Sequence, residues 1–350
     1  MIFPYQRAQV SFKKIEEIGQ EGRNSRVYRA HDEHLDAELV IKEIDLKGRD
    51  PREFFSEAQL LYRGAHPNIL EVKYACLDKE RIYIATPFYK NGSLKKFMAH
   101  RFITVREIIR FSTQILNGLH HIHSKGLIHF DVKPDNVLLS DRNEALLSDF
   151  GMTKLMGEEG EATPNGFYSK HVPPEVFSDT QISFDNRYDI YQVGLTMYRM
   201  CVGDWQFDAQ FGELMRGVKS QDEAKVVLAR ATRKGVFPDR RSYPHHIPRK
   251  LISAISKCLK PNPGERFGSA IAVVNAISDI DGPILHWQFV PDEKVMRWEQ
   301  CVDGARKVLE VCNTKRESKA YRHRNGADPR RVAKFCKEEI SDKEIVEFLE

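Results

Sequence analysis

The sequence has no long apolar run and only a few, widely spaced cysteines. No stretch approaches the roughly 18 apolar residues that a membrane-spanning helix needs, and residues 1–10 lack the apolar segment of a signal peptide. The 6 cysteines include no CxxC pair, which argues against a disulfide scaffold or a zinc site. We therefore expect reduced thiols, no membrane span and a cytoplasmic location.

The chain also has little net charge. Its 54 basic and 50 acidic side chains leave +4 over 350 residues, which does not favour nucleic acid as a partner. Hydrophobic residues at 41% and charged residues at 30% are typical of a globular protein with a real core. The length predicts two domains, or one two-lobed domain with an appendage.

Strand-like segments dominate the first 90 residues, and helical spacing dominates the rest. The predicted strands cover residues 13–18, 26–30, 38–44, 69–76 and 81–86. Residues 52–63 have helical spacing, and residues 105–125 predict a long helix that ends at Gly126. This order predicts an α+β fold with a small antiparallel-sheet lobe that holds one main helix, a short connector and a larger, mainly helical lobe.

Several short strings follow one another in a fixed order. H-F-D-V-K-P-D-N stands at residues 129–136, and D-F-G follows at residues 149–151. V-I-K at residues 40–42 precedes both, and P-P-E at residues 173–175 follows them. Asp189 and Arg266 follow these strings further along the chain. In this order and spacing, the strings and the two residues resemble the motifs of the protein kinase family.

The resemblance implies a catalytic role for the first string. Asp131 would accept the proton of the attacking hydroxyl, and Lys133 would neutralise the γ-phosphate of ATP as charge develops. Asn136 and Asp149 would ligate Mg²⁺, with Mn²⁺ as an alternative, because both side chains offer hard oxygen ligands. A polar turn before a buried strand is the bland alternative for this string.

Two further elements would hold the ATP phosphates. Lys42 would contact the α- and β-phosphates and pair with Glu57 on the following helix. The G-Q-E-G-R-N-S string, with Gly19, Gly22 and Ser25, resembles a glycine-rich loop whose backbone amides approach phosphate. Ser25 stands where the family's third glycine is usual, and a plain hairpin turn explains the string as well.

The resemblance also places the adenine site. Thr86 aligns with the gatekeeper position, and Pro87 and Tyr89 align with the connector that binds adenine through backbone groups. Proline keeps its carbonyl acceptor, so the backbone contact at residue 87 would survive. Three apolar residues would sandwich the ring, namely Val27, Val40 and Leu138.

One departure from the family bears on regulation. Phe130 replaces the arginine that in many members binds a phosphorylated activation loop, and phenylalanine cannot bind phosphate. We therefore expect an activity that does not depend on phosphorylation at the hydroxyls of the segment between D-F-G and P-P-E. Those hydroxyls belong to Thr153, Thr163, Tyr168 and Ser169.

The function implied is a serine/threonine protein kinase with a signalling or regulatory role and autophosphorylation. Lys133 favours serine and threonine over tyrosine, although dual specificity stays open. One alternative is a pseudokinase that acts as a scaffold, and its mark would be loss of Lys42, Asp131 or Asp149. The other is a small-molecule kinase of a related fold, which generally lacks the Glu175 and Arg266 positions.

The resemblance covers residues 11–280. The small lobe spans about residues 11–86, the connector, or hinge, residues 87–91, and the large lobe residues 92–280.

Residues 281–350 lie beyond the kinase-like region, and we expect a charged, helical extension. Trp287 and Trp298 indicate that part of it packs on the large lobe. Residues 313–337 have nine basic and two acidic side chains (+7), whereas residues 338–350 have one and six (−5). The extension either stabilises the domain, or its residues 313–350 contact a partner or autoinhibit the lobe.

Overall fold

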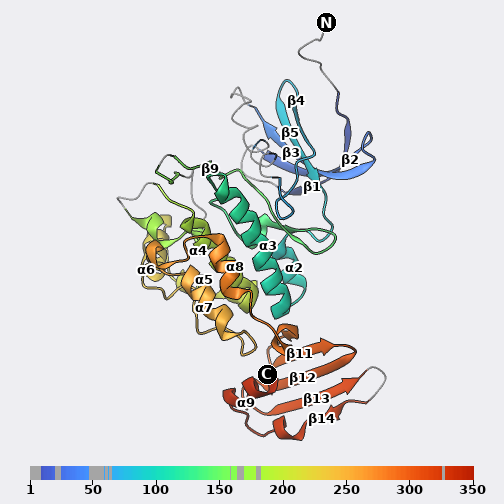
Figure 1. The fold of residues 1–350 in the computed structure, drawn as a ribbon, viewed down its shortest axis with the longest axis vertical. Helices are drawn as coiled ribbons and strands as arrows, with labels where there is room; N and C mark the ends of the chain where they lie inside the picture. The colour runs from blue at the N-terminus through green and yellow to red at the C-terminus, as the bar shows by residue number, and fades with distance from the viewer. Residues whose placement is uncertain are drawn as a thin grey trace.

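A computed structural model of the chain describes residues 9–19, 25–46, 59, 62, 65–157, 159–163, 169–178, 183–324 and 328–350. Figure 1 shows three parts stacked along the long axis: a small sheet, a helical body and a second sheet at the C-terminal end. Within these ranges, no helix is long and apolar enough to cross a bilayer.

The small lobe is a five-stranded antiparallel sheet in the order β1-β2-β3-β5-β4. Its strands are β1 (Phe12–Gly19), β2 (Ser25–Asp32), β3 (Ala37–Asp45), β4 (Tyr74–Leu77) and β5 (Arg81–Pro87). Alternate residues of β3 and β5, among them Ile41, Ile82 and Ile84, are buried. The strand predicted at residues 69–76 begins only at Tyr74, because Ile69 makes an isolated parallel bridge to Leu147 instead.

Most of the predicted helix at residues 52–63 lies outside the described residues. Gly22 and Glu57 lie outside them too.

The large lobe contains the described helices between residues 94 and 277, with short strands between them. The helices are α2 (Leu94–His100), α3 (Val105–Ser124), α4 (Arg187–Val202), α5 (Asp204–Leu214), α6 (Gln221–Arg233), α7 (Arg249–Cys258) and α8 (Ala270–Ile277). The strands are β6 (Leu127–Ile128), β7 (Val137–Leu139), β8 (Ala145–Leu147) and β9 (Lys154–Leu155). Short 3-10 turns lie at Pro134–Asn136, Ser169–His171, Pro174–Phe177, Pro263–Glu265 and Pro283–His286.

Helix α3 confirms the helix predicted at residues 105–125. Thr104 and Glu107 form a capping box that satisfies the first backbone amides. Its apolar residues, including Ile108 and Phe111, are fully buried against the lobe core. Gly126 ends the helix with a positive φ of 74°, which glycine adopts without a steric cost.

The C-terminal tail, residues 287–350, is a second antiparallel sheet, so the prediction of a helical extension is wrong. The sheet has the order β10-β11-β12-β13-β14, and one helix, α9 (Asp342–Leu349), packs on it. Its strands are β10 (Trp287–Phe289), β11 (Val295–Val302), β12 (Ala305–Cys312), β13 (Ser318–Arg324) and β14 (Arg330–Arg331). Apolar residues that alternate along residues 295–312, and the left-handed turn Asp303-Gly304, are the missed signals of a hairpin.

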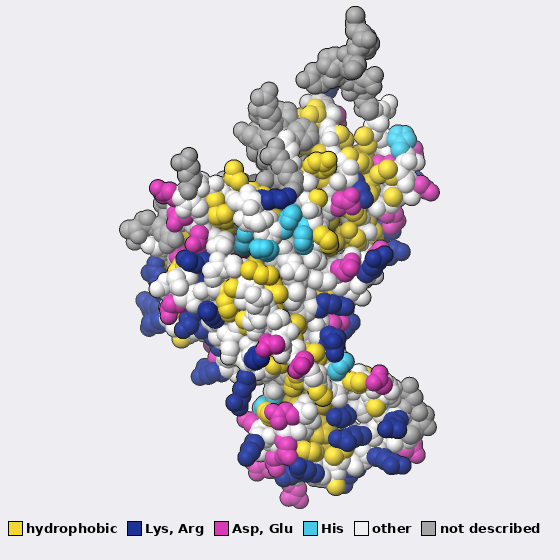
Figure 2. Space-filling view, viewed as in Figure 1, with side chains coloured by type: hydrophobic (Ala, Val, Ile, Leu, Met, Phe, Trp, Pro, Cys, Tyr) yellow, Lys and Arg dark blue, Asp and Glu magenta, His cyan; other side chains and the backbone are white. Residues whose placement is uncertain are grey.

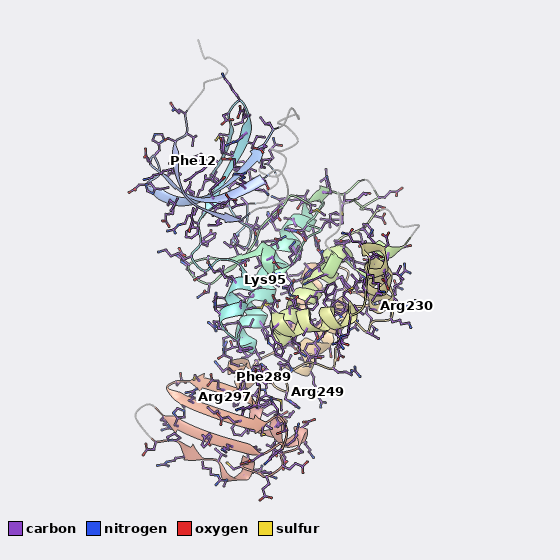
Figure 3. The ribbon with its side chains drawn as sticks, turned by 180° about the vertical axis from the view of Figure 1, so that it is seen from behind. Phe12, Lys95, Arg230, Arg249, Phe289 and Arg297 are labelled. Atoms are coloured by element: carbon purple, nitrogen blue, oxygen red, sulfur yellow. The ribbon has the colours of Figure 1, made fainter. Side chains whose placement is uncertain are left out.

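The tail packs on the large lobe through Trp298, whose ring meets that of His245 at 5.7 Å between centroids, whereas Trp287 is part of the tail's own core. Trp287 and Trp298 are fully buried, and the Trp287 indole donates to the Leu349 carbonyl at 2.6 Å. Figure 3 shows Phe289 at the junction, where its ring stacks on His246 of the large lobe at 6.1 Å between centroids. Gln288 donates across the same junction to the Phe102 carbonyl.

Candidate active site

The site is built on the loop that joins β6 to β7. There the Lys133 ammonium donates to both carboxylate oxygens of Asp131, at 3.0 and 2.8 Å. The Asn136 amide donates to the Asp131 carboxylate at 2.7 Å and to its backbone carbonyl at 2.9 Å. All three residues are buried. The carboxylate of Asp131 is therefore held in one orientation by a cation and an amide, as a base that must meet a substrate hydroxyl requires.

Side chains of helix α4 accept hydrogen bonds from the backbone of this loop. The carboxylate of Asp189 accepts from the backbone amides of His129 and Phe130, both at 2.9 Å, and lies 2.8 Å from the ring of His123. Gln192, one turn further, accepts from the backbone amide of Val132 at 2.9 Å. Asp189 and Gln192 accept from the backbone amides of His129, Phe130 and Val132, which flank Asp131, and do not touch the Asp131 side chain. They are therefore positioning residues.

Phe130 stands in a strained backbone conformation with φ = 67°. A left-handed residue other than glycine costs about 1–2 kcal/mol. The Phe130 amide donates to Asp189, and its carbonyl accepts from Gln192. These two hydrogen bonds, together with burial of the ring, offset that cost. The ring packs edge-on against Tyr188 at 4.9 Å and Phe184 at 6.4 Å between centroids. An apolar cluster therefore occupies the place where the family's arginine would meet a phosphate.

The hydroxyl side chains between D-F-G and P-P-E, at which phosphorylation is expected not to be required, differ in accessibility. Thr153 is buried, and its hydroxyl has no hydrogen-bond partner among the described residues. Thr163 is exposed. Tyr168 and the side chain of Ser169 lie outside the described part of the chain.

Lys42 and Asp149 face each other from the two lobes. The Lys42 ammonium, on β3, lies 3.8 Å from the Asp149 carboxylate. Asp149 also has a positive φ of 57°, which places the D-F-G string in a sharp turn. The neighbouring Phe150 ring is buried and meets the ring of His129 at 4.8 Å between centroids. Burial lowers the pKa of His129, so this ring stays neutral beneath the loop.

Asn136 and Asp149 fit the role of magnesium ligands. The amide nitrogen of Asn136 is used by Asp131, which leaves the amide oxygen as its remaining donor to a cation. The Asp149 carboxylate is about one-quarter exposed, so one face of it is open. Among the described residues, no group of three or more His, Cys, Asp or Glu side chains could hold a metal. Two protein oxygens suit Mg²⁺, which usually retains waters and takes its other ligands from phosphates.

The predicted adenine residues lie together where the two lobes meet. Register places Val40 opposite Thr86 and Val27 opposite Lys42, so adjacent strands bring these positions close together. Val27, Val40 and Leu138 are half-buried, whereas the neighbouring core residues of the same strands are buried. Burial raises the pKa of Tyr89. Pro87 ends β5 two residues before Tyr89, as the predicted connector requires.

The structure describes only the two ends of the glycine string, so the loop itself stays a prediction. Gly19 is the last residue of β1, opposite Val27, and Ser25 is the first residue of β2. The residues between them, including Gly22, lie outside the described chain. The partner predicted for Lys42, Glu57, lies outside it too, and stays a prediction.

The late family positions form a buried ion pair. The Arg266 guanidinium donates to both oxygens of Glu175, at 2.7 and 2.6 Å. It also donates to the carbonyl of Lys260 at 2.8 Å, and its plane lies over the ring of Tyr191 at 4.8 Å from the centroid. This pair ties the segment after the D-F-G turn to the end of the large lobe.

Sequence reasoning missed a network of charges beside the catalytic loop. Lys95, labelled in Figure 3, binds Asp135 of the loop at 2.7 Å. Arg199, buried in α4, binds Asp204 at 2.5 Å and lies 3.9 Å from Asp135. Burial, with the charge of Arg199, lowers the pKa of His171 well below its usual value. These residues come from segments that are far apart in the sequence. Only Asp135 lies in a string that the sequence analysis had singled out, P-D-N at residues 134–136.

The comparisons agree with the geometry. The family described as "Protein kinase domain" matches residues 12–276. A probable serine/threonine-protein kinase of Dictyostelium discoideum, samkB, is 32% identical over 55% of this chain and 34% of its own length. A probable serine/threonine-protein kinase of Clostridium acetobutylicum is 27% identical over 77% of this chain and 40% of its own length. The serine/threonine-protein kinase STE20 of Eremothecium gossypii is 29% identical over 55% of this chain and 20% of its own length.

The chain belongs to the protein kinase family, because the family match covers about three-quarters of its residues. It has the family's two-lobed fold, with an antiparallel-sheet small lobe and a helical large lobe. The chain spans well under half the length of these three curated relatives.

Proposed function

We propose that the chain transfers the γ-phosphoryl group of ATP to serine and threonine hydroxyls of proteins. The observation that carries this proposal is the buried Asp131 carboxylate, which Lys133 and Asn136 hold in one orientation. The printed names of the relatives, which are serine/threonine kinases, support the choice of acceptor.

In the proposed reaction, Asp131 accepts the proton of the attacking hydroxyl. Lys133 lies 2.8 Å from that carboxylate, where its charge also reaches the phosphoryl oxygens as they become more negative. Lys42 supplies a second positive charge from the small lobe. Positioning and charge do the work, since this reaction needs no covalent enzyme intermediate.

Asn136 and Asp149 would hold Mg²⁺, with Mn²⁺ as the alternative. The metal supplies charge neutralisation for the β- and γ-phosphates when it is bound. Chelation should abolish transfer, and replacement of Mg²⁺ by Mn²⁺ in a rate assay distinguishes the two ions.

The test of the function is transfer of labelled γ-phosphate from ATP to a mixed peptide library with serine, threonine or tyrosine as the acceptor. Asp131→Asn should lower the rate by about 10²–10⁴, the usual worth of a positioned base. Asp303→Asn is the matched control, because it makes the same carboxylate-to-amide change in an exposed turn of the tail. Equal rates for wild type and Asp131→Asn would contradict the proposal.

The same assay separates the alternatives. A scaffold without transferase activity would bind ATP and label no peptide, although Lys42, Asp131, Asn136 and Asp149 are all present. A small-molecule kinase would label an aminoglycoside or choline in place of the peptides. The buried Glu175–Arg266 pair favours the protein kinase.

A further inference from the structure

Three basic side chains form a row across the tail sheet. Register places Lys307 of β12 opposite Arg322 of β13, and Arg322 opposite Arg330 of β14. Adjacent strands lie about 4.8 Å apart, and side chains directly opposite one another share one face of the sheet. Like charges in that arrangement repel, so this row costs the fold stability unless an anion neutralises it.

The row has no acidic partner within the described ranges, whereas other cations of the tail do. Arg316, for example, lies 2.6 Å from Asp342. No ion pair joins Lys307, Arg322 or Arg330 to a carboxylate of the described chain. Within the described residues, three adjacent cations are thus available to an anionic ligand.

The row lines a cavity of about 570 Å³. The side chains around it are mostly cationic, with one carboxylate, that of Asp328, among them. Lys307 is half-buried, and this burial, with the charge of Arg322, lowers the pKa of its ammonium. The other members of the lining are Ala305, Arg306, His323 and Arg324.

Among the described residues, the core that α9 covers does not extend to this end of the sheet. Two residues further along the same face, Leu309 and Ala320 are fully buried in the core that α9 covers. Lys307 and Arg322 therefore lie where the apolar core ends. Figure 2 shows lysine and arginine side chains gathered over the strands of the tail.

The composition of the tail favours a discrete phosphate over a long polyanion. Residues 287–350 have 14 basic and 13 acidic side chains, a net charge of 14 − 13 = +1, which is too small to attract nucleic acid or an anionic membrane by charge alone. No Phe, Tyr or Trp side chain of the described residues lines the cavity, so bases would find little stacking surface there beyond the imidazole of His323. Guanidinium groups bind a phosphate monoester with two parallel hydrogen bonds, which suits a compact site of this kind.

We propose that the row of Lys307, Arg322 and Arg330 binds the phosphate of a phosphoserine or phosphothreonine in a protein segment. The inference rests on the proposed function only for the source of this ligand, since a serine/threonine kinase makes such groups. Figure 1 shows the tail at the end of the large lobe opposite the small lobe, so a docked phosphoprotein leaves the catalytic site accessible. The tail is then a docking module for proteins that are already phosphorylated.

The test is direct binding of synthetic peptides to the full chain. The probes are a fluorescent peptide library with one fixed phosphoserine among neutral residues, and the same library with serine. Wild type should bind only the first, and Lys307→Gln/Arg322→Gln should raise its Kd at least about tenfold, because charge-assisted hydrogen bonds are lost. Lys315→Gln/Lys319→Gln removes the same charge from a turn and the opposite face, and should leave the Kd unchanged.

A second variant guards against misfolding. Arg322→Glu places a carboxylate between two cations, so it should raise the melting temperature while it abolishes phosphopeptide binding. The proposal would be overturned if the serine library bound as tightly as the phosphoserine library, or if the row variants bound as wild type does. It would also be overturned if the chain bound only a mixed-sequence oligonucleotide or only phosphatidylserine vesicles. Because the peptides are synthetic, these results do not depend on whether the chain transfers phosphate.

Discussion

The ring of Phe130 should stabilise the catalytic loop and the segment that follows the D-F-G turn. It is 2% exposed and lies in a cluster with Ile128, Ala162, Phe184 and Tyr188. Removal of a fully buried phenylalanine ring costs about 3–5 kcal/mol, so Phe130→Ala should lower the free energy of unfolding by that amount.

The backbone at this position allows a finer test. Alanine keeps the left-handed φ of 67° and its cost, whereas glycine adopts that conformation freely. Phe130→Gly should therefore be more stable than Phe130→Ala by up to about 1 kcal/mol, although glycine usually destabilises. At an ordinary position the order would be reversed.

Urea unfolding followed by tryptophan fluorescence measures both differences, and peptide phosphorylation gives kcat and KM. We expect a lower kcat for Phe130→Ala, because the residue next to it is Asp131, and a smaller loss for Phe130→Leu, which retains most of the apolar volume. A loss of stability below about 1 kcal/mol in Phe130→Ala would refute the packing argument. A kcat equal to that of wild type would refute the link between this cluster and the base.

Four further predictions concern other parts of the chain. Thr163→Val should retain wild-type activity in a peptide phosphorylation assay, since Phe130 offers no phosphate site; an inactive variant would contradict this reading. Arg266→Met should cost about 3–5 kcal/mol in urea unfolding, because it leaves the Glu175 carboxylate buried and unpaired, and Glu175→Gln in the same chain should restore part of it. Asp189→Asn should lower kcat with little change in the KM for ATP, since an amide cannot accept from both loop amides with two oxygens. Burial lowers the pKa of His246 to about 3. Below pH 6.5 the unfolded chain therefore binds a proton at this residue that the folded chain does not bind, and the free energy of unfolding decreases as the pH is lowered. Between pH 7 and pH 5 this loss should be about 2 kcal/mol, and His246→Gln should show a shallower dependence.

Much of the site could be read from the sequence because its residues are close together along the chain. Asp131, Lys133 and Asn136 lie within one loop of six residues, so their order alone predicts that they meet. The lysine on β3 and the aspartate of D-F-G are far apart in sequence. Their proximity at 3.8 Å followed only from the resemblance, and the fold confirms it.

The tail shows where sequence reasoning failed. Its alternation of apolar and polar residues and its Asp303-Gly304 turn indicate strands, whereas the sequence analysis predicts a helical extension. The sequence shows the excess of basic residues at 313–337, but it does not show which of them lie next to one another in the fold. Strand register alone places Lys307 beside Arg322 and Arg330.

The sequence by itself determined the family, the catalytic loop and the division into two lobes, because local strings and periodicity encode them. The tertiary structure decided which distant groups support that loop: Asp189 and Gln192 from α4, and the Phe130 cluster. It also decided which charges of the described residues are paired with one another, as Arg316 is with Asp342, and which are not. Those outcomes depend on register and packing between segments that are remote in sequence, and no local pattern specifies them.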